Sequence, residues 1–183
     1  MAMQHTVQHS MYIRSCELDQ DSEAIQRILN HVIQTSTALY DYETRPLAQV
    51  TAWIQQKQTA GLPLRGAFDA NDRLLGFATY GPFRPQPAYK YTVELSIYVD
   101  QDARGHGVAS VLMQDLIDLA KHHQRHVMVG CIDATNEASI ALHRKFGFDH
   151  CGTVKQAGFK FGRWLDAAFY QKILPTPETP VDD

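Results

Sequence analysis

Apolar residues recur along this chain with two different periods, and the changes between them predict the order of its elements. Between Ile25 and Ile33 they fall at helical spacing, after candidate N-cap residues at 19–23, so we expect a helix that buries one face. Pro46 suits the first turn of a second helix. The inner side of that helix is expected to carry Leu47, Val50, Trp53 and Ile54.

The second half of the chain alternates strand and helix patterns. A third helix is expected over 108–122 and a short one over 136–146, which Gly147 would end in the left-handed conformation. Strand patterns occupy 11–14, 64–68, 73–80, 91–99, 127–132, 152–154 and 166–173. The second and third of these strands are joined by 70–72 and form a hairpin. We therefore expect one domain over 11–174, with flexible tails at 1–10 and 175–183.

Composition narrows the class of protein. The chain has 183 residues, of which 44% are hydrophobic, and this suits a single compact domain. A net charge of -3 gives no basic surface of the kind that binds nucleic acid. No apolar run reaches the length that a bilayer requires, and 1–10 lacks the apolar centre of a signal peptide. The three cysteines form no metal or disulfide pattern, so we expect a cytoplasmic protein.

The most informative motif is a glycine-rich loop between a strand and a helix. Arg104-Gly105-His106-Gly107-Val108-Ala109 follows the apolar strand that ends at Val99. At such a helix N-terminus the backbone N–H groups and the helix dipole favour an anion. Glycine lets a pyrophosphate approach the backbone. A nucleotide phosphate loop is a weaker interpretation, because no Gly-Lys-Ser/Thr sequence follows.

Several separate motifs together resemble the GNAT acetyltransferases. The loop matches that family's Arg/Gln-x-x-Gly-x-Gly/Ala signature, and Asn136, Ala138, His143 and Gly147-Phe148 match a second one. The resemblance runs from Tyr12 to Leu174 and is greatest to the phosphinothricin and methionine sulfoximine branch. Segments that match this branch are 35–37, 91–94, 97–99, 142–143 and 158–164. The resemblance implies an α/β fold of the GNAT type, a mixed twisted sheet flanked by helices and splayed at an acetyl-CoA site.

The resemblance also implies an activity and a set of cofactor contacts. The activity is direct transfer of acetyl from acetyl-CoA to the α-amine of a small amino-acid analogue in a ternary complex, without metal. Acetyl-CoA would be bound by Ile97, Tyr98 and Val99 through their backbone, by Arg104, Gly105, His106, Gly107, Val108, Ala109 and Ser110, and by Asn136 and Lys145. Asn136 is equally suited to be a helix N-cap, and Lys145 to be a solvated surface lysine. Two rival functions are acetylation of another small amine and silent binding of acyl-CoA as a sensor.

Glu94 and His143 are the candidate catalytic residues. Alternation in strand 91–99 puts Glu94 on one face with Thr92, Ser96 and Tyr98, well placed to take a proton from the amine directly or through a water. His143 stands where many family members carry the tyrosine that protonates the leaving thiolate. A histidine can supply that proton or relay the proton of the amine. The alternative roles are a solvated strand carboxylate and a hydrogen-bonded core histidine.

The proline-rich segment 81–87 suggests a substrate pocket. Arg84 can pair with the carboxylate of an amino acid. The resemblance implies that Pro87, Ala88 and Tyr89 line the same pocket, and Thr37 and Tyr40 would close it. An exposed loop is an equally good interpretation of the segment.

Two further clusters carry less information about chemistry. His122, His123 and His126 lie near a helix end without an accompanying carboxylate, so a cationic helix terminus explains them better than a metal site. Phe159, Phe161 and Trp164 form an aromatic patch suited to core or subunit packing. Because the enzymes of the resembling branch are dimers, we expect a homodimer with this segment at its interface.

Overall fold

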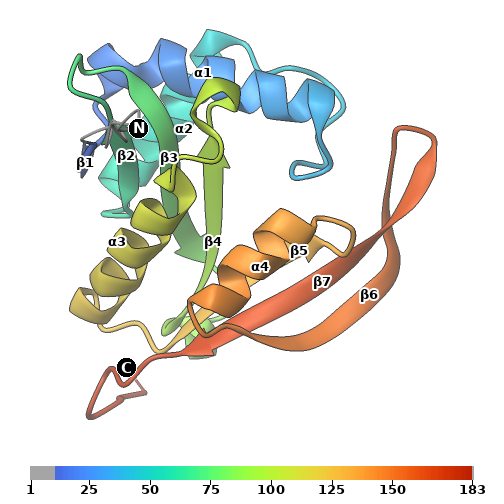
Figure 1. The fold of residues 1–183 in the computed structure, drawn as a ribbon. Helices are drawn as coiled ribbons and strands as arrows, with labels where there is room; N and C mark the ends of the chain where they lie inside the picture. The colour runs from blue at the N-terminus through green and yellow to red at the C-terminus, as the bar shows by residue number, and fades with distance from the viewer. Residues whose placement is uncertain (1–10, 183) are drawn as a thin grey trace, which may run out of the picture.

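The computed structural model describes residues 11–182, in which helices cover both faces of a seven-stranded mixed sheet (Figure 1). In chain order the elements are β1 (Tyr12–Ser15), α1 (Leu18–Thr35), α2 (Leu47–Thr59), β2 (Leu64–Phe68), β3 (Leu74–Pro82), β4 (Thr92–Val99), α3 (Val108–His122), β5 (Val127–Asp133), α4 (Glu137–Lys145), β6 (Asp149–Lys160) and β7 (Arg163–Ile173). Single 3-10 turns, η1 (Pro87–Tyr89) and η2 (Gln101–Ala103), flank β4. This is the α/β architecture that the sequence predicts.

The sheet opens between its two central strands. The strand order is β1-β2-β3-β4-β5-β7-β6, and β4 pairs with β5 in parallel while the other neighbours are antiparallel. The β4–β5 pairing extends only from Thr92↔Val127 to Glu94↔Val129. Beyond Glu94, β4 continues alongside β3 as far as Val99↔Gly76, and β5 continues alongside β7. The two halves of the sheet therefore diverge after Glu94, as the resemblance implies.

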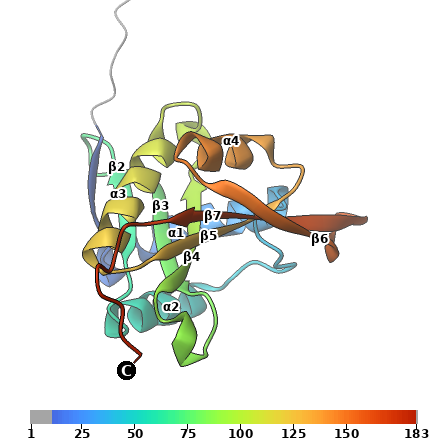
Figure 2. The ribbon, with the colours of Figure 1, turned by 90° about the horizontal axis from the view of Figure 1, so that it is seen from below.

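Each face of the sheet has its own core. On one face, α3 and α4 pack against Val93, Leu95, Met128, Ile132 and Tyr170. On the other, α1 and α2 cover the first strands, with Phe68, Phe77 and Leu74 at the centre of the core. Figure 2 shows α2 and α4 on opposite sides of the strands. Side chains alternate between the two faces along a strand. Successive residues of β4 therefore face α3 and α4 on one side and α1 and α2 on the other.

Local signals explain most of the element boundaries. The spacing of Ile25, Ile28, Leu29, Val32 and Ile33 does bury one face of α1. Helix α1 begins earlier than predicted, at Leu18, and the Asp21 carboxylate accepts a hydrogen bond from the Glu17 N–H at 2.7 Å. Gly147 has φ +74 after α4, as expected. Leu47 is 37% exposed, so its predicted place in the core is wrong; only Val50 and Ile54 of α2 are buried.

The largest departure from the sequence prediction is a long hairpin made by β6 and β7, which extends away from the body (Figure 1). The expected strands at 152–154 and 166–173 are parts of strands of 12 and 11 residues. Register shifts between His150 and Gly152 and between Val154 and Gly158 interrupt the apolar alternation of β6, which hides its length in the sequence.

The structure describes most of one predicted tail and none of the other. The segment 1–10 and Asp183 lie outside the described residues. Residues 175–182, which we expected to be flexible, make hydrogen bonds with the body of the protein. The Thr176 hydroxyl donates to the Arg125 carbonyl at 2.6 Å, and the Val181 N–H donates to the Tyr91 hydroxyl at 3.1 Å. These hydrogen bonds hold the C-terminal segment beside the start of β4.

Candidate active site

A cleft of about 990 Å³ occupies the opening between β4 and β5. Its walls come from the segment after α1, the second half of β4, the glycine-rich loop, the end of β5, helix α4 and two residues of the β6–β7 hairpin. Because no strand pairs with β4 on this side after Glu94 among residues 11–182, the backbone edge from Ser96 to Val99 is available to a ligand. Ile97, Tyr98 and Val99, the three residues expected to contact acetyl-CoA through their backbone, all line the cleft.

The glycine-rich loop, residues 104–109, has a conformation that suits the binding of an anion, and we call it the anion cradle. Gly105 and Gly107 have φ +79 and +82, and no atom lies within 4 Å of a Cβ built on either of them. Gly107 is the N-cap of α3, whose first N–H groups and dipole therefore face the cleft. The cleft lining includes Arg104, Gly105, Gly107, Val108, Ala109 and Ser110 but not His106. Since Val108 is 1% exposed and belongs to the core, its side chain is structural.

Two polar residues at the ends of α4, its N-cap Asn136 and its last residue Lys145, support the loop and the cleft. Asn136 lines the cleft, and its side chain also accepts a hydrogen bond from the Ser139 N–H at 3.1 Å, so the N-cap role is present. Lys145 does not line the cleft, but its ammonium group donates to the Ser110 hydroxyl at 3.1 Å. Its positive charge therefore lies beside the first turn of α3.

Glu94 stands at the point where the sheet opens. It shares a face with Tyr98, whose ring lies 5.3 Å from the Phe77 ring on the side of α1 and α2. Burial raises the pKa of Glu94 above its ordinary value, and the positive charge of Arg84 partly opposes this rise. A carboxylate with a raised pKa is a better proton acceptor for an amine.

His143 approaches the cleft from the opposite face. It is 5% exposed and packs against Phe148 and Tyr170, and burial lowers the pKa of its imidazole. Nδ1 lies 2.8 Å from the Ser139 carbonyl oxygen, which can only accept, so Nδ1 carries the hydrogen. Nε2 is buried without a hydrogen-bond partner among the described residues. In this neutral state His143 accepts a proton or a hydrogen bond at Nε2, which favours the relay over the donor role.

The predicted substrate residues are only partly brought together. Thr37 and Tyr40 line the cleft, whereas Arg84, Pro87, Ala88 and Tyr89 are exposed and are not part of its lining. The Arg84 guanidinium lies 4.2 Å from the centre of the Phe83 ring and donates to the Phe83 carbonyl at 2.7 Å. Its charge nevertheless acts on Glu94 and on Cys131. Arg84 is thus at the margin of the site.

Comparison with known proteins agrees with this geometry. The model of the Acetyltransferase (GNAT) family matches residues 25–148, more than half of the chain. The chain belongs to the GNAT acetyltransferase family. An L-methionine sulfoximine/L-methionine sulfone acetyltransferase of Pseudomonas aeruginosa is 42% identical over 161 residues, which cover 87% of this chain and 94% of that protein.

Solved structures extend the comparison to three dimensions. A protein from Acinetobacter baylyi ADP1, described as a putative acetyltransferase, is 52% identical with a TM-score of 0.95, over 98% of this chain and 100% of that one. A GNAT superfamily phosphinothricin acetyltransferase from Sinorhizobium meliloti, solved in complex with acetyl-CoA, is 31% identical with a TM-score of 0.88, over 93% of this chain and 92% of that one.

The structure adds residues to this GNAT site that the sequence analysis missed. Asp133, at the end of β5, has a fully buried side chain and accepts from Thr37, Thr135 and Arg163. Burial alone would raise its pKa, but these hydrogen bonds and the charge of Arg163 bring the pKa below its ordinary value. Lys160 is 3% exposed. Its ammonium group donates to three carbonyl oxygens, of Ile33 at 2.7 Å, Ser36 at 2.9 Å and Leu39 at 2.6 Å.

These contacts hold the segment after α1 in the GNAT cleft wall. Thr37 is tied to β5 through Asp133, and the carbonyls on either side of it are tied to the hairpin through Lys160. A Cβ on Gly158 would lie 2.6 Å from the Tyr40 ring, so this glycine makes room for Tyr40. Asp133 could have been found in the sequence as an acidic residue that follows a buried strand. Lys160 has no such signal in the sequence, because its three partners are more than a hundred residues away.

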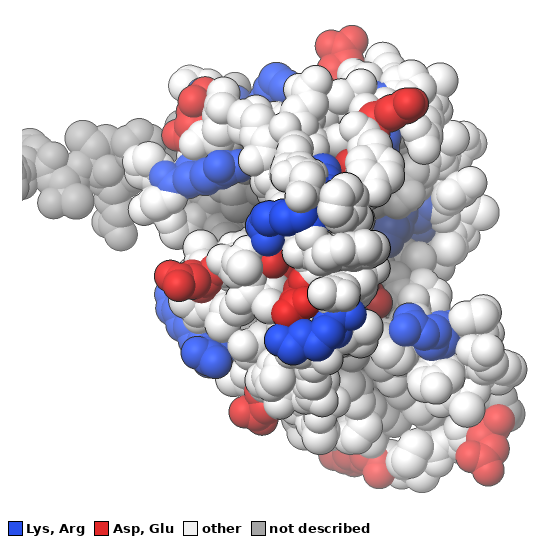
Figure 3. Space-filling view, turned by 90° about the vertical axis from the view of Figure 1, so that its right-hand side faces the viewer, with Lys and Arg blue, Asp and Glu red and all other residues white. Residues whose placement is uncertain are grey.

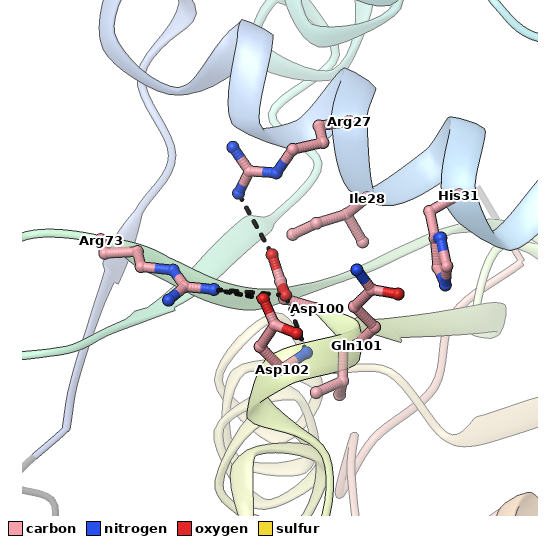
Figure 4. Close-up of a pocket in the computed structure, with 8 residues that line it drawn as sticks. Arg27, Ile28, His31, Arg73, Asp100, Gln101 and Asp102 are labelled. Carbon is pink, nitrogen blue, oxygen red and sulfur yellow. Dashed lines mark hydrogen bonds and ion pairs between the residues drawn. The ribbon is translucent and has the colours of Figure 1, made fainter.

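A second pocket, of about 450 Å³, lies where α1 crosses the end of β4 (Figure 4). The Asp100 carboxylate points into it between Arg27 at 3.1 Å and Arg73 at 3.4 Å, and also accepts from the Asp102 N–H at 3.0 Å. Burial alone would raise the pKa of Asp100, but these contacts lower it. Since Asp100 begins the turn before the glycine-rich loop, these ion pairs fix the entry to the anion cradle.

Neither a metal-ligand cluster nor a helix able to cross a membrane is found within residues 11–182 of this GNAT domain. Across residues 11–182, no three His, Cys, Asp or Glu side chains are grouped as metal ligands would be. His123 instead shares a 2.6 Å hydrogen bond with the Tyr80 hydroxyl. None of the helices in the described part of the chain could cross a bilayer. On the face shown in Figure 3, basic and acidic side chains are intermingled.

Proposed function

We propose that this protein transfers the acetyl group of acetyl-CoA to the α-amine of a small amino acid with a polar tail, of the methionine sulfoximine, methionine sulfone and phosphinothricin type. The observation that carries this proposal is the cleft between β4 and β5. A carboxylate with a raised pKa stands at its start, and an anion cradle lies at the α3 end. The names of the relatives support the substrate class.

The residues of the cleft fit acetyl-CoA. The open cradle at Gly105 and Gly107 suits a pyrophosphate, and the exposed edge of β4 suits an extended chain that contains amides. Bound acetyl-CoA supplies an acetyl group already activated as a thioester. A backbone N–H of the 97–99 edge is placed to polarise the acetyl carbonyl.

The two candidate catalytic residues work from opposite faces of the sheet. Glu94 faces α1 and α2, so the amine is deprotonated on that side, directly or through one water. His143 lies behind Gly130 on the side of α3 and α4, which is the side of the anion cradle. Its unpartnered Nε2 can receive a proton on that side.

Arg84 is proposed as the carboxylate anchor. Its charge reaches Glu94, and the α-amine and α-carboxylate of an amino acid are attached to one carbon. A guanidinium within reach of Glu94 can therefore bind the carboxylate while Glu94 receives the amine proton. The present contact of Arg84 with Phe83 is on the surface and can be exchanged for a substrate contact.

We also propose that the protein acts in the cytoplasm as a homodimer. Three neighbouring aromatic residues at the hairpin tip are between 47% and 59% exposed: Phe159 at 47%, Phe161 at 58% and Trp164 at 59%. They form no part of the core of one protomer, and such a patch is typical of an interface. Phe161 also lines the cleft, so a partner covering this patch would border the active site. Light scattering at micromolar concentration tests this, and a monomer would contradict it.

An acetyl-transfer assay tests the enzymatic proposal. Release of CoA is followed with methionine sulfoximine, methionine sulfone and phosphinothricin at millimolar concentration, and with their methyl esters. We expect acetylation of the free acids and poor turnover of the esters. Turnover of a polyamine instead would indicate another small-amine enzyme, and tight acetyl-CoA binding without any turnover would indicate a sensor. Equal turnover of acids and esters would remove Arg84 from the substrate site.

A further inference from the structure

We propose that Arg163 determines specificity by binding the oxygen or nitrogen acceptors at the far end of the substrate's side chain. This inference rests on the proposed function and concerns a residue to which the sequence alone gave no role in the site. Arg163 is the first residue of β7, after the turn of the hairpin. It lines the cleft together with Phe161, Tyr40 and Thr37.

The guanidinium of Arg163 is only weakly used within the protein. Asp133 already accepts from the Thr37 hydroxyl and from the N–H and hydroxyl of Thr135, each of the latter at 2.9 Å. The contacts of Arg163 Nη2 are longer, 3.3 Å to Asp133 and 3.4 Å to the Thr135 hydroxyl. Nε and Nη1 make no hydrogen bond with any residue in 11–182, and the side chain is 47% exposed. Several N–H donors therefore remain free for a ligand.

Arg163 and Glu94 face the same side of the sheet. Glu94 pairs with Val129 on β5, Asp133 pairs with Ala167 on β7, and residues two apart along a strand share a face. Val129 and Asp133 are on one face, and so are Ala167 and Arg163. One substrate molecule lying on this face of the sheet could therefore offer its amine to Glu94 and its tail to Arg163.

The spacing along β5 separates the two ends of that molecule. The four residue steps from Val129 to Asp133 span about 13 Å at the rise of a strand. Arg84 acts on Glu94, at the start of this path, and on Cys131, at its midpoint, whereas the charges that act on Tyr40 are those of Cys131, Asp133 and Arg163, from the midpoint to the end. The amine and carboxylate therefore belong at the Glu94 and Arg84 end. The side chain of the substrate extends past Cys131 towards Arg163.

The chemistry at the far end fits a polar tail. A guanidinium only donates, and the sulfone, sulfoximine and phosphinate groups present acceptors in a tetrahedral arrangement. Tyr40 and Phe161 add ring surface for the methylene groups between the two ends. An apolar tail of equal length would leave these donors unsatisfied, so the inference predicts discrimination between methionine sulfone and methionine.

Steady-state kinetics of R163Q with these two substrates test the inference. We expect R163Q to lower kcat/KM for methionine sulfone about 10–100-fold, mostly through KM, as for a lost hydrogen bond to a charged group. The value for methionine should change little, so the preference for the sulfone should collapse. R163K keeps the positive charge but not the planar set of guanidinium N–H donors, so its kcat/KM for methionine sulfone should lie between those of R163Q and the unmodified protein. The Kd of acetyl-CoA should be unchanged in both variants.

K155Q is the matched control. Lys155 lies on the same hairpin, forms an ion pair with Asp166 at 2.8 Å, is 77% exposed and does not line the cleft. Its substitution should leave the sulfone preference unchanged. An equal rise of KM for both substrates in R163Q would overturn the inference, because Arg163 would then act on their common part or on the cleft wall. A retained preference would also overturn it. Lack of turnover of every tested amino acid by the unmodified protein would instead overturn the proposed function, and this inference with it.

Discussion

The contact between Gly130 and His143 allows a quantitative test of how the site is built. A Cβ on Gly130 would lie 2.8 Å from His143 Cδ2 and closer still to Nε2. The imidazole cannot simply move aside. It is 5% exposed, its ring centre lies 5.1 Å from that of Phe148, and its Nδ1 is bonded to the Ser139 carbonyl. Gly130→Ala therefore forces the buried ring out of its site.

The expected loss of stability has two parts. Overpacking of a filled core costs about 1–3 kcal/mol. The broken hydrogen bond to Ser139 adds about 1 kcal/mol. For a domain of this size the total corresponds to a Tm lower by roughly 4–16 °C. Because the displaced ring no longer presents Nε2, kcat should fall as well.

A double-mutant cycle separates this contact from other effects. In His143→Ala the ring is gone, so adding Gly130→Ala should cost nothing further, and the two changes should be non-additive by the full cost of Gly130→Ala alone, about 2–4 kcal/mol. Urea unfolding measures the free energies, and the acetyl-transfer assay measures kcat. Gly81→Ala on β3 is the control for stability, since the nearest atom to its new Cβ, Lys57 Nζ, is 3.5 Å away. Additive effects, or a Gly130→Ala protein as stable and active as the unmodified one, would refute the reasoning.

Three further predictions concern the base, its pH dependence and the cofactor. Glu94→Gln keeps the shape of the side chain but not its basicity, so kcat should fall about 10²-fold or more with the Kd of acetyl-CoA intact; near-normal turnover at neutral pH would make Glu94 a structural residue. Burial raises the pKa of Glu94, so the fall of kcat/KM on the acidic side should occur at a higher pH than for an ordinary carboxylate. Because the charge of Arg84 lowers this pKa, Arg84→Ala should move the acidic fall to a still higher pH. Arg84→Lys keeps the charge and should leave the acidic fall nearly in place. Gly107→Val puts a β-branched residue at φ +82 and fills the cradle, so calorimetry should find acetyl-CoA binding at least about 10-fold weaker, with circular dichroism confirming the fold; unchanged affinity would contradict the assignment of the cradle.

The sequence by itself determined the elements and the chemistry that depends on neighbours along the chain. The periodicity of 25–33, the hairpin at 64–80 and the strand–loop–helix motif at 97–109 were all predicted, because each depends on local propensity, turn residues or alternation. The grouping of Glu94 with Thr92, Ser96 and Tyr98 on one face of its strand also followed from alternation alone. The family motifs added the acetyl-CoA site and the place of His143.

The tertiary structure decided which of these residues meet. Alternation cannot show that β4 and β5 separate after Glu94, because a register between strands thirty-five residues apart depends on packing of the whole sheet. Nor can it show that the Asp133 carboxylate draws Thr37 and Arg163 into one cleft wall, or that Lys160 is buried among carbonyls of α1 and the segment after it. A lysine or an arginine in a sequence is by default a solvated surface charge. Only the fold shows that Lys160 satisfies buried backbone oxygens and that Arg163 keeps free donors inside the cleft, because long-range contacts decide whether a charge is desolvated and how its hydrogen bonds are used.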